Sequence, residues 1–172
     1  CNTSKDEQVL VKVGVSAVDI AGARKNVESE IPGWDFEKVR KDARTAWNEY
    51  LSKIDITTSD KEDKAIFYTA LYHTGISPNL FTDADGRYLG MDLEVHQGDT
   101  LNPIYTVFSL WDTFRALHPL MTIIDPDLNN HFINSLIKKH QEGGIYPMWD
   151  LASNYTGTMI GYHAVPVIVD AY

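Results

Sequence analysis

The feature that most constrains this chain is an amphipathic repeat between residues 35 and 54. Apolar side chains recur there at the 3.6-residue spacing of an α-helix, and charged side chains fill the opposite face. The apolar positions are Phe36, Val39, Ala43, Trp47, Tyr50 and Ile54. Such a stripe has to be buried against another element, so the pattern predicts a domain in which helices pack on helices.

Other segments carry helix signals of their own. A capping box at residues 59–62 opens a helix that Gly75 ends, and Asp125-Pro126 opens another that Gly143-Gly144 ends. A kink is expected at Pro119, because proline cannot donate the backbone hydrogen bond of a continuous helix. Besides 35–51, the predicted helices cover residues 17–30, 59–74, 109–124, 125–143 and 156–172.

Strand signals are few. Val9–Val15 is β-branched and partly alternating, which predicts a strand, and residues 80–82 and 87–89 predict a hairpin around the turn 83–86. The first strand has no partner in sequence, and the predicted last helix has no stop signal before Tyr172. Both observations predict that the chain is a piece of a longer polypeptide.

Composition and missing motifs exclude several functions. The chain has 24 acidic and 15 basic residues and a net charge of −9, which argues against a nucleic-acid partner. It contains no run of about 18 apolar residues, so no transmembrane segment is predicted. Cys1 is the only cysteine, which excludes an internal disulfide. Nucleotide-binding glycine loops and the His-Glu-x-x-His zinc motif are absent.

The first candidate site is Trp111-Asp112. An indole ring can stack on the C–H face of a sugar, and a carboxylate accepts hydrogen bonds from sugar hydroxyls. The same residues also fit a helix start, because Ser109 and Asp112 have the spacing of a capping box. Both interpretations stay open at this stage.

The second candidate site is Trp149-Asp150, with Asn154 and His163 following it. An apolar ring against a carboxylic acid disfavours the charged form, which suits a general acid near neutral pH. The alternative for Asp150 is an exposed loop carboxylate or a helix cap. His163 falls inside the predicted last helix, where a core histidine is the alternative to a ligand.

Several long blocks around these sites resemble glycoside hydrolase family 92, and the resemblance runs from about Val9 to Tyr172. The blocks are FYTALYHT at 67–74, PNLF at 78–81, DGRY at 85–88, YTVFSLWDTFRALHP at 105–119 and MIGYHAVPVIVDAY at 159–172. The resemblance implies a mainly α fold, a partial (α/α)6 barrel with one strand left over from an N-terminal β-sandwich domain. On this view residues 1–16 end the β-sandwich, 17–33 form a linker helix, and 34–172 begin a truncated catalytic domain.

The resemblance also implies an activity. The family consists of bacterial, exo-acting, inverting α-mannosidases that need Ca²⁺ and trim mannose from N-glycans or mannan. The implied partner is therefore a mannose-containing oligosaccharide, besides the missing parts of the same polypeptide. The implied location is the periplasm, the cell surface or the extracellular space. The calcium ligands are expected mostly outside this chain, so no metal ligand is assigned.

Roles for individual residues follow from the same resemblance. Trp111 and Asp112 match a family pair that looks like a contact to the terminal mannose, and Asp150 stands where the family usually has a glutamate that resembles the general acid. Trp149, Asn154 and His163 would line the cleft, and the general base is expected beyond Tyr172. The chain departs from the family at Asp150, one methylene shorter than glutamate, and at Tyr155, where a second carboxylate is lost. These departures leave a non-catalytic carbohydrate-binding or scaffold protein as the alternative.

Overall fold

A computed structural model describes residues 3–172, so the single cysteine, Cys1, lies outside the described residues. Helices dominate, and the strands are two or three residues long. In chain order the elements are α1 (Ile20–Glu30), α2 (Phe36–Leu51), α3 (Lys61–Thr74), β1 (Asn79–Leu80), β2 (Arg87–Leu89), β3 (Val95–Gln97), β4 (Tyr105–Thr106), α4 (Leu110–Thr113), α5 (Leu117–Ile124), α6 (Pro126–Gly143), β5 (Asp150–Leu151), β6 (Asn154–Tyr155) and α7 (Ala164–Ala171).

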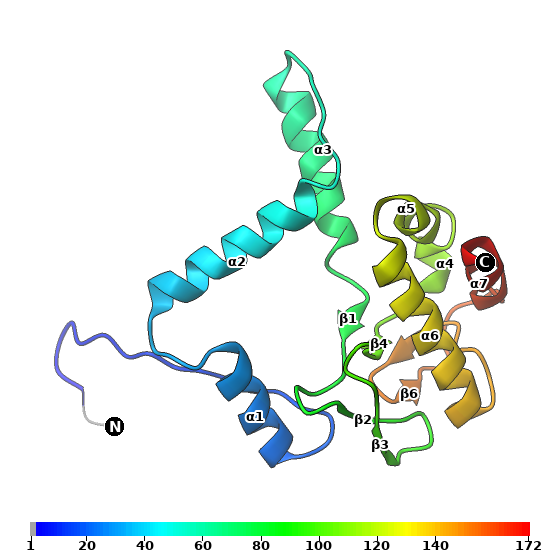
Figure 1. Cartoon of the computed structure of the whole chain (residues 1–172), viewed down its shortest axis with the longest axis horizontal. Helices are drawn as coiled ribbons and strands as arrows, with labels where there is room; N and C mark the ends of the chain where they lie inside the picture. The colour runs from blue at the N-terminus through cyan, green and yellow to red at the C-terminus, as the bar shows by residue number, and fades with distance from the viewer. Residues whose placement is uncertain (1–2) are drawn as a thin grey trace.

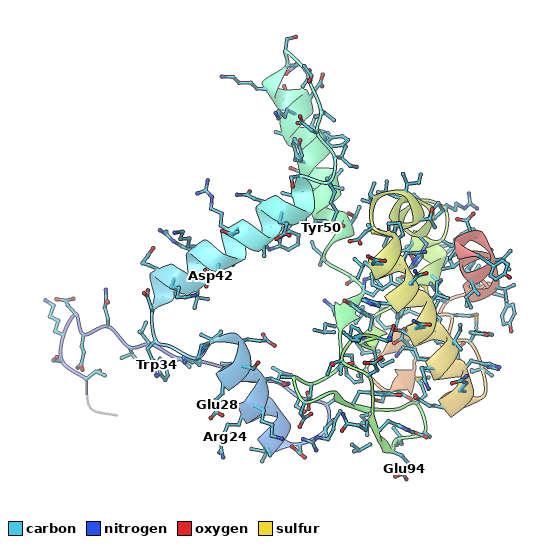
Figure 2. The ribbon with its side chains drawn as sticks, in the orientation of Figure 1. Arg24, Glu28, Trp34, Asp42, Tyr50 and Glu94 are labelled. Atoms are coloured by element: carbon cyan, nitrogen blue, oxygen red, sulfur yellow. The ribbon has the colours of Figure 1, made fainter. Side chains whose placement is uncertain are left out.

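The first three helices form an open arc, hereafter the open arm, which meets the rest of the chain at both ends, with α1 near β2 and α3 leading into β1 (Figure 1). An aspartate side chain caps each of them and accepts a hydrogen bond from a backbone N–H in the first turn. The cap of α3 is Asp60, one residue after the start of the predicted capping box. No residue of α2 is buried, although its amphipathic pattern is the strongest in the sequence. Figure 2 places Asp42 on this open arm, together with Arg24 and Glu28 on α1.

The hydrophobic core lies among helices α4 to α7. It consists of Phe108, Leu110, Met121, Phe132, Leu136, Ala164 and Val167. Asp125 ends α5 and caps α6, as the sequence predicts, and Gly144 ends α6 in the left-handed conformation that glycine adopts without strain. Lys53 reaches Asp125 at 3.1 Å and so ties the end of α2 to this core.

The strands form three antiparallel pairs, β1 with β4, β2 with β3 and β5 with β6. The predicted turn at residues 83–86 is present, because the Gly86 N–H donates to the Asp83 carbonyl at 2.8 Å. The predicted hairpin is wrong in its partners. Leu80 pairs with Tyr105 and Arg87 with Gln97, so the segments on the two sides of the turn pair with later strands and not with each other.

Three other predictions need correction. Residues 9–15 form no strand, because no other described segment offers them a hydrogen-bonding edge, and Val11, Val13 and Val15 are exposed. The helix predicted at 156–172 is confined to α7, since Gly157 and Gly161 have positive φ angles that interrupt it. The helix predicted at 109–124 breaks at residues 114–116, so Pro119 lies in the first turn of α5.

None of the helices formed by residues 3–172 is both long enough and apolar enough to span a bilayer.

Candidate active site around helix α4

Helix α4 carries the first candidate pair, Trp111-Asp112. The side chains of Leu110 and Trp111, which are neighbours on this helix, face different surroundings. Leu110 is completely buried and anchors the helix to the core, whereas Trp111 is 48% exposed. Asp112 is exposed, and its carboxylate accepts a hydrogen bond from the Ser109 hydroxyl. The Ser109 side chain caps no backbone N–H, and its contact with Asp112 joins the two side chains, so neither of the backbone hydrogen bonds of the predicted capping box is present. The pair therefore offers an aromatic face and an oriented carboxylate to solvent.

Asp150 lies beneath this helix and has no exposed surface. One carboxylate oxygen accepts a hydrogen bond from the Thr106 hydroxyl at 2.7 Å and lies 3.0 Å from the Lys139 ammonium. The other accepts the Phe108 backbone N–H at 3.0 Å. Lys139 is itself only 3% exposed, so this ion pair is buried on both sides. The hydrogen-bonding capacity of the Asp150 carboxylate is directed into the protein.

The indole of Trp149 and the carboxylate of Asp150 occupy an extended segment, in which consecutive side chains point to opposite faces. Trp149 is half-buried and forms an isolated β-bridge with Ser109. The environment that sequence reasoning gave Asp150, an apolar ring beside a carboxylic acid, is thus replaced by a lysine, a hydroxyl and an amide. Asn154 lies across the β5–β6 hairpin and is exposed.

The sequence placed His163 inside the predicted last helix. In the structure it is the N-cap residue of α7. Its ring stacks on Phe114, which follows α4, with ring centroids 4.0 Å apart and planes tilted by 32°. The imidazole also lies over Gly161, where an added Cβ would be 2.0 Å from the His163 Cε1. His163 therefore joins α7 to the end of α4.

The structure brings the two predicted clusters together. The Ser109–Trp149 bridge and the Phe108–Asp150 hydrogen bond join the segment before α4 to strand β5. Sequence reasoning missed Lys139 and Thr106, the two side chains that hold Asp150. One signal for Lys139 was available, because it stands three residues after Leu136 and seven after Phe132, on the apolar face of α6. A lysine at such a position needs a buried anionic partner.

His118 is a second buried polar group close to this site. Its ring stacks on Phe108, with centroids 6.4 Å apart, and it is 2% exposed. Neither ring nitrogen has a hydrogen-bond partner among residues 3–172. Burial lowers the pKa of His118 to about 4, because the apolar surroundings disfavour the charged imidazolium.

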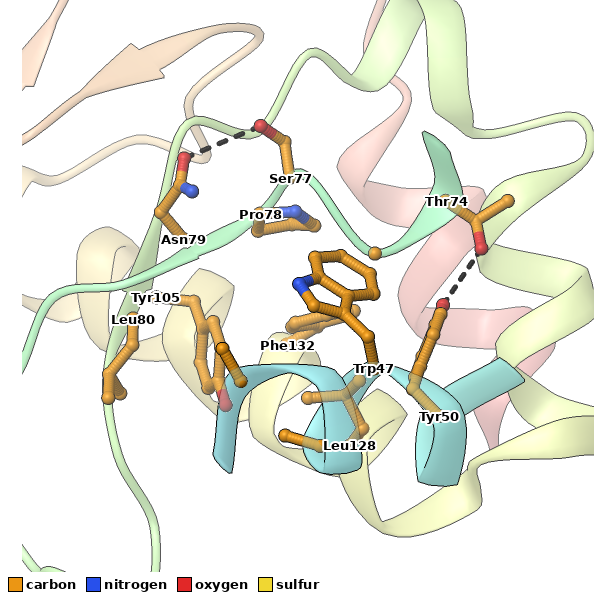
Figure 3. A pocket seen from close by; sticks show the side chains of 13 residues that line it. Trp47, Tyr50, Thr74, Ser77, Pro78, Asn79, Leu80, Tyr105, Leu128 and Phe132 are labelled. Carbon is orange, nitrogen blue, oxygen red and sulfur yellow. Dashed lines mark hydrogen bonds between the residues drawn. The ribbon is translucent and has the colours of Figure 1, made fainter. Parts of the chain in front are cut away.

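A cavity of about 410 Å³ lies between α2 and the core, away from α4 (Figure 3). Aromatic and aliphatic groups dominate its lining, among them Trp47, Tyr50, Tyr105 and Phe132. The Tyr50 and Thr74 hydroxyls share a hydrogen bond of 2.8 Å at its edge. The lining residues include no carboxylate, so this cavity lacks the acid and base that glycoside hydrolysis uses.

Within residues 3–172, no group of three or more His, Cys, Asp or Glu side chains is close enough to hold a metal ion. Calcium prefers six to eight oxygen ligands.

Two solved structures with a similar fold are mannosidases of family GH92. The family GH92 α-mannosidase BT3965 from Bacteroides thetaiotaomicron superimposes with a TM-score of 0.83 and 38% identity over 88% of this chain and 20% of that one. It has also been solved in complex with mannoimidazole. The family GH92 inverting mannosidase BT2199 from the same organism gives a TM-score of 0.83 and 32% identity over 91% of this chain and 21% of that one.

Sequence comparison gives the same class. An uncharacterized secreted glycosidase from Arthroderma benhamiae is 38% identical across 53% of this chain and 14% of its own length. The model of the glycosyl hydrolase family 92 catalytic domain matches residues 22–172. The chain belongs to this glycoside hydrolase family, and it spans about a fifth of the length of the solved structures that it matches. The resemblance of the motif blocks to this family is thereby confirmed.

Proposed function

We propose that this chain is part of an exo-acting, inverting α-mannosidase that removes terminal mannose from N-glycans or mannan. The observation that carries the proposal is the exposed Trp111 beside the oriented carboxylate of Asp112, in a chain of family 92. The ring would stack on the sugar, and the carboxylate would accept hydrogen bonds from two of its hydroxyls. The names of two similar structures, an α-mannosidase and an inverting mannosidase, support the substrate and the stereochemistry.

Asn154 and His163 are proposed as further contacts of the bound oligosaccharide. Asn154 is exposed on β6, and His163 packs on Phe114 directly after α4. Trp149, half-buried beside Ser109, would support the floor of the same site. An inverting glycosidase needs two carboxyl groups about 6.5–9.5 Å apart with a water between them. We infer that the base lies in a part of the enzyme other than residues 3–172.

The proton-donor role of Asp150 stays a prediction. A general acid has to come within hydrogen-bonding distance of the leaving oxygen. With no exposed surface and with Thr106, Phe108 and Lys139 around it, the Asp150 carboxyl would have to leave its partners to do so. The Asp150→Asn variant separates the proton-donor role from a role in which Asp150 only positions other groups.

The architecture and location of the whole enzyme are proposals of the same kind. Helices α2 to α7 would form one part of an (α/α)6 barrel, with residues 17–33 as the linker to an N-terminal β-sandwich. Calcium would help to bind the sugar hydroxyls and would take its ligands mainly from other parts of the enzyme. The name of the secreted fungal relative supports a periplasmic, cell-surface or extracellular location.

The test uses the full-length protein and a set of α-linked mannobioses. We expect release of mannose with inverted configuration, observed by NMR, and loss of activity after treatment with a chelator followed by recovery on addition of Ca²⁺. Binding of mannose-type ligands without turnover would favour the non-catalytic alternative. Activity that a chelator leaves unchanged would remove calcium from the proposal.

A further inference from the structure

The backbone directly before α4 adopts a conformation that its residue does not favour. Val107 has a φ angle of +65°, in the left-handed region that β-branched residues rarely adopt. Its two neighbours, Thr106 and Phe108, are the residues that donate hydrogen bonds to Asp150. An unfavourable backbone conformation of this kind persists only where its surroundings impose it. The Asp150 carboxylate thus contacts the residues on both sides of Val107, through the Thr106 hydroxyl and the Phe108 backbone N–H.

From these contacts we propose that Asp150 is a positioning residue, which holds the strained turn at Val107 so that α4 presents Trp111 and Asp112 to the sugar. Lys139 completes the unit, because its ammonium balances the buried carboxylate at 3.0 Å. This inference rests on the function proposed above for Trp111 and Asp112.

A continuous set of contacts leads from Asp150 to the proposed sugar contacts. Phe108 is bound to Asp150 through its N–H, and the next residue, Ser109, is bridged to Trp149. The Ser109 hydroxyl donates to the Asp112 carboxylate and sets its direction. Leu110, fully buried, fixes the helix so that Trp111 projects outward. Losing the charge of Asp150 would therefore displace groups that it does not touch.

The decisive experiment compares two substrates of the full-length Asp150→Asn variant, an activated aryl α-mannoside and an α-linked mannobiose. A positioning role predicts that kcat/KM falls by the same factor for both substrates, roughly tenfold to a hundredfold, because misplaced sugar contacts do not depend on the leaving group. Much of the loss should appear in KM. A large loss with the mannobiose and little with the activated mannoside would overturn the proposal, because only the poor leaving group needs a proton.

A second substitution tests the strain. Glycine adopts positive φ angles without steric cost, so Val107→Gly should recover part of the activity that Asp150→Asn loses. Losses that simply add in the double variant would show that Asp150 does not hold Val107.

If Asp150→Asn does not fold, the variant Thr106→Val tests the positioning role instead, because it removes one hydrogen-bond donor to Asp150 with almost no change of side-chain shape. Its activity should fall, whereas Thr122→Val, which removes the hydroxyl that donates to Pro119 on α5, should stay within about twofold of wild type.

Amide hydrogen exchange provides a readout that does not need turnover. Exchange at residues 107–112 should be at least roughly tenfold faster in Asp150→Asn than in wild type, because the Phe108 N–H loses a charged acceptor. Unchanged exchange would overturn the positioning role, even if the wild-type protein proved inactive on every mannoside. Inactivity of the wild type would count against the proposed function alone.

Discussion

Two of the ion-pair clusters that join separate elements of this chain differ in how much water reaches them. The inner pair, Lys139 and Asp150, connects α6 to β5 and is 3% and 0% exposed. The outer cluster connects α1 to the turn before β2, through Asp19, Lys25, Asp85 and Arg87 at distances of 2.9–3.0 Å. In the outer cluster the side chains of Lys25 and Asp19 are 58% and 45% exposed.

The comparison shows that burial decides how much stability is lost when one member of an ion pair is removed. In the outer cluster a charge that loses its partner is hydrated again, so exposed pairs contribute little. In the inner pair the remaining charge has no water to replace its partner, and the full cost of burying it appears. The same chemical contact is therefore expected to matter far more beneath α4 than beside α1.

The largest effect is expected from Lys139→Met. The substitution leaves the Asp150 carboxylate buried without its cation, which should lower the free energy of unfolding by about 3–5 kcal/mol. Urea unfolding of the full-length protein measures it. The matched control is Lys138→Met, since Lys138 is exposed and should change the free energy by less than about 0.5 kcal/mol. Equal effects of the two substitutions would contradict the contrast between buried and exposed charges.

A second test probes Asp83, which joins α1 to the turn before β2 and is 5% exposed. It accepts hydrogen bonds from Ser16 at 2.6 Å and Asn26 at 2.7 Å, and a Cβ on Gly22 would lie 2.3 Å from its Oδ2. Alanine normally stabilises a helix relative to glycine. Gly22→Ala should instead lower the free energy of unfolding by roughly 1–3 kcal/mol, because the carboxylate has to move.

The control for Gly22→Ala is Gly33→Ala, where an added Cβ meets no other atom within 4 Å. Thermal unfolding of both variants gives the comparison. A Gly22→Ala protein as stable as wild type would mean that α1 is free to move away from Asp83.

The third prediction concerns pH and the core that surrounds the inner pair. Burial lowers the pKa of His118 to about 4 from the ordinary value of 6.5, so the unfolded chain takes up a proton before the folded one does. The contribution of neutral His118 is complete above pH 6.5 and is lost as the pH falls toward 4. Between pH 7 and pH 5 the expected loss is about 2 kcal/mol.

Urea unfolding at the two pH values, for wild type and His118→Phe, measures this loss. Phenylalanine can stack on Phe108 as the imidazole does, but it cannot take up a proton. The variant should therefore lose less stability than wild type as the pH falls. Identical pH profiles would assign the acid sensitivity to other groups.

The smallest effect is expected from Asp85→Asn in the outer cluster. The hydrogen bond from Lys25, with further bonds from Arg87, lowers the pKa of Asp85 to about 2. Its contribution is present above the ordinary pKa of 3.8 and disappears as the pH falls through about 2. At neutral pH the variant should differ from wild type only slightly in 20 mM NaCl and not at all in 500 mM NaCl, because salt screens exposed charges. A large difference that persists in high salt would contradict the assignment of this cluster to the surface.

The local parts of the fold could be predicted from the sequence because their causes are local. Asp35 begins α2, Asp125 begins α6 and Gly144 ends it, since capping depends on residues within one turn. The strand partners could not be predicted, because Leu80 and Tyr105 are brought together by a connection of more than twenty residues. Residues 9–15 are rich in valine, which favours a strand, but a strand forms only where the edge of another strand is available to pair with it.

For the candidate site the sequence by itself determined the family and the two aromatic-carboxylate pairs, because both are properties of residues next to each other in the chain. Only the tertiary structure decided what surrounds each carboxylate. Asp112 is turned to solvent by Ser109, whereas Asp150 is turned inward to Lys139, eleven residues earlier on α6, and to the amide of Phe108. The physical reason is that an extended segment sends neighbouring side chains to opposite faces, so Trp149 does not form the surroundings of Asp150.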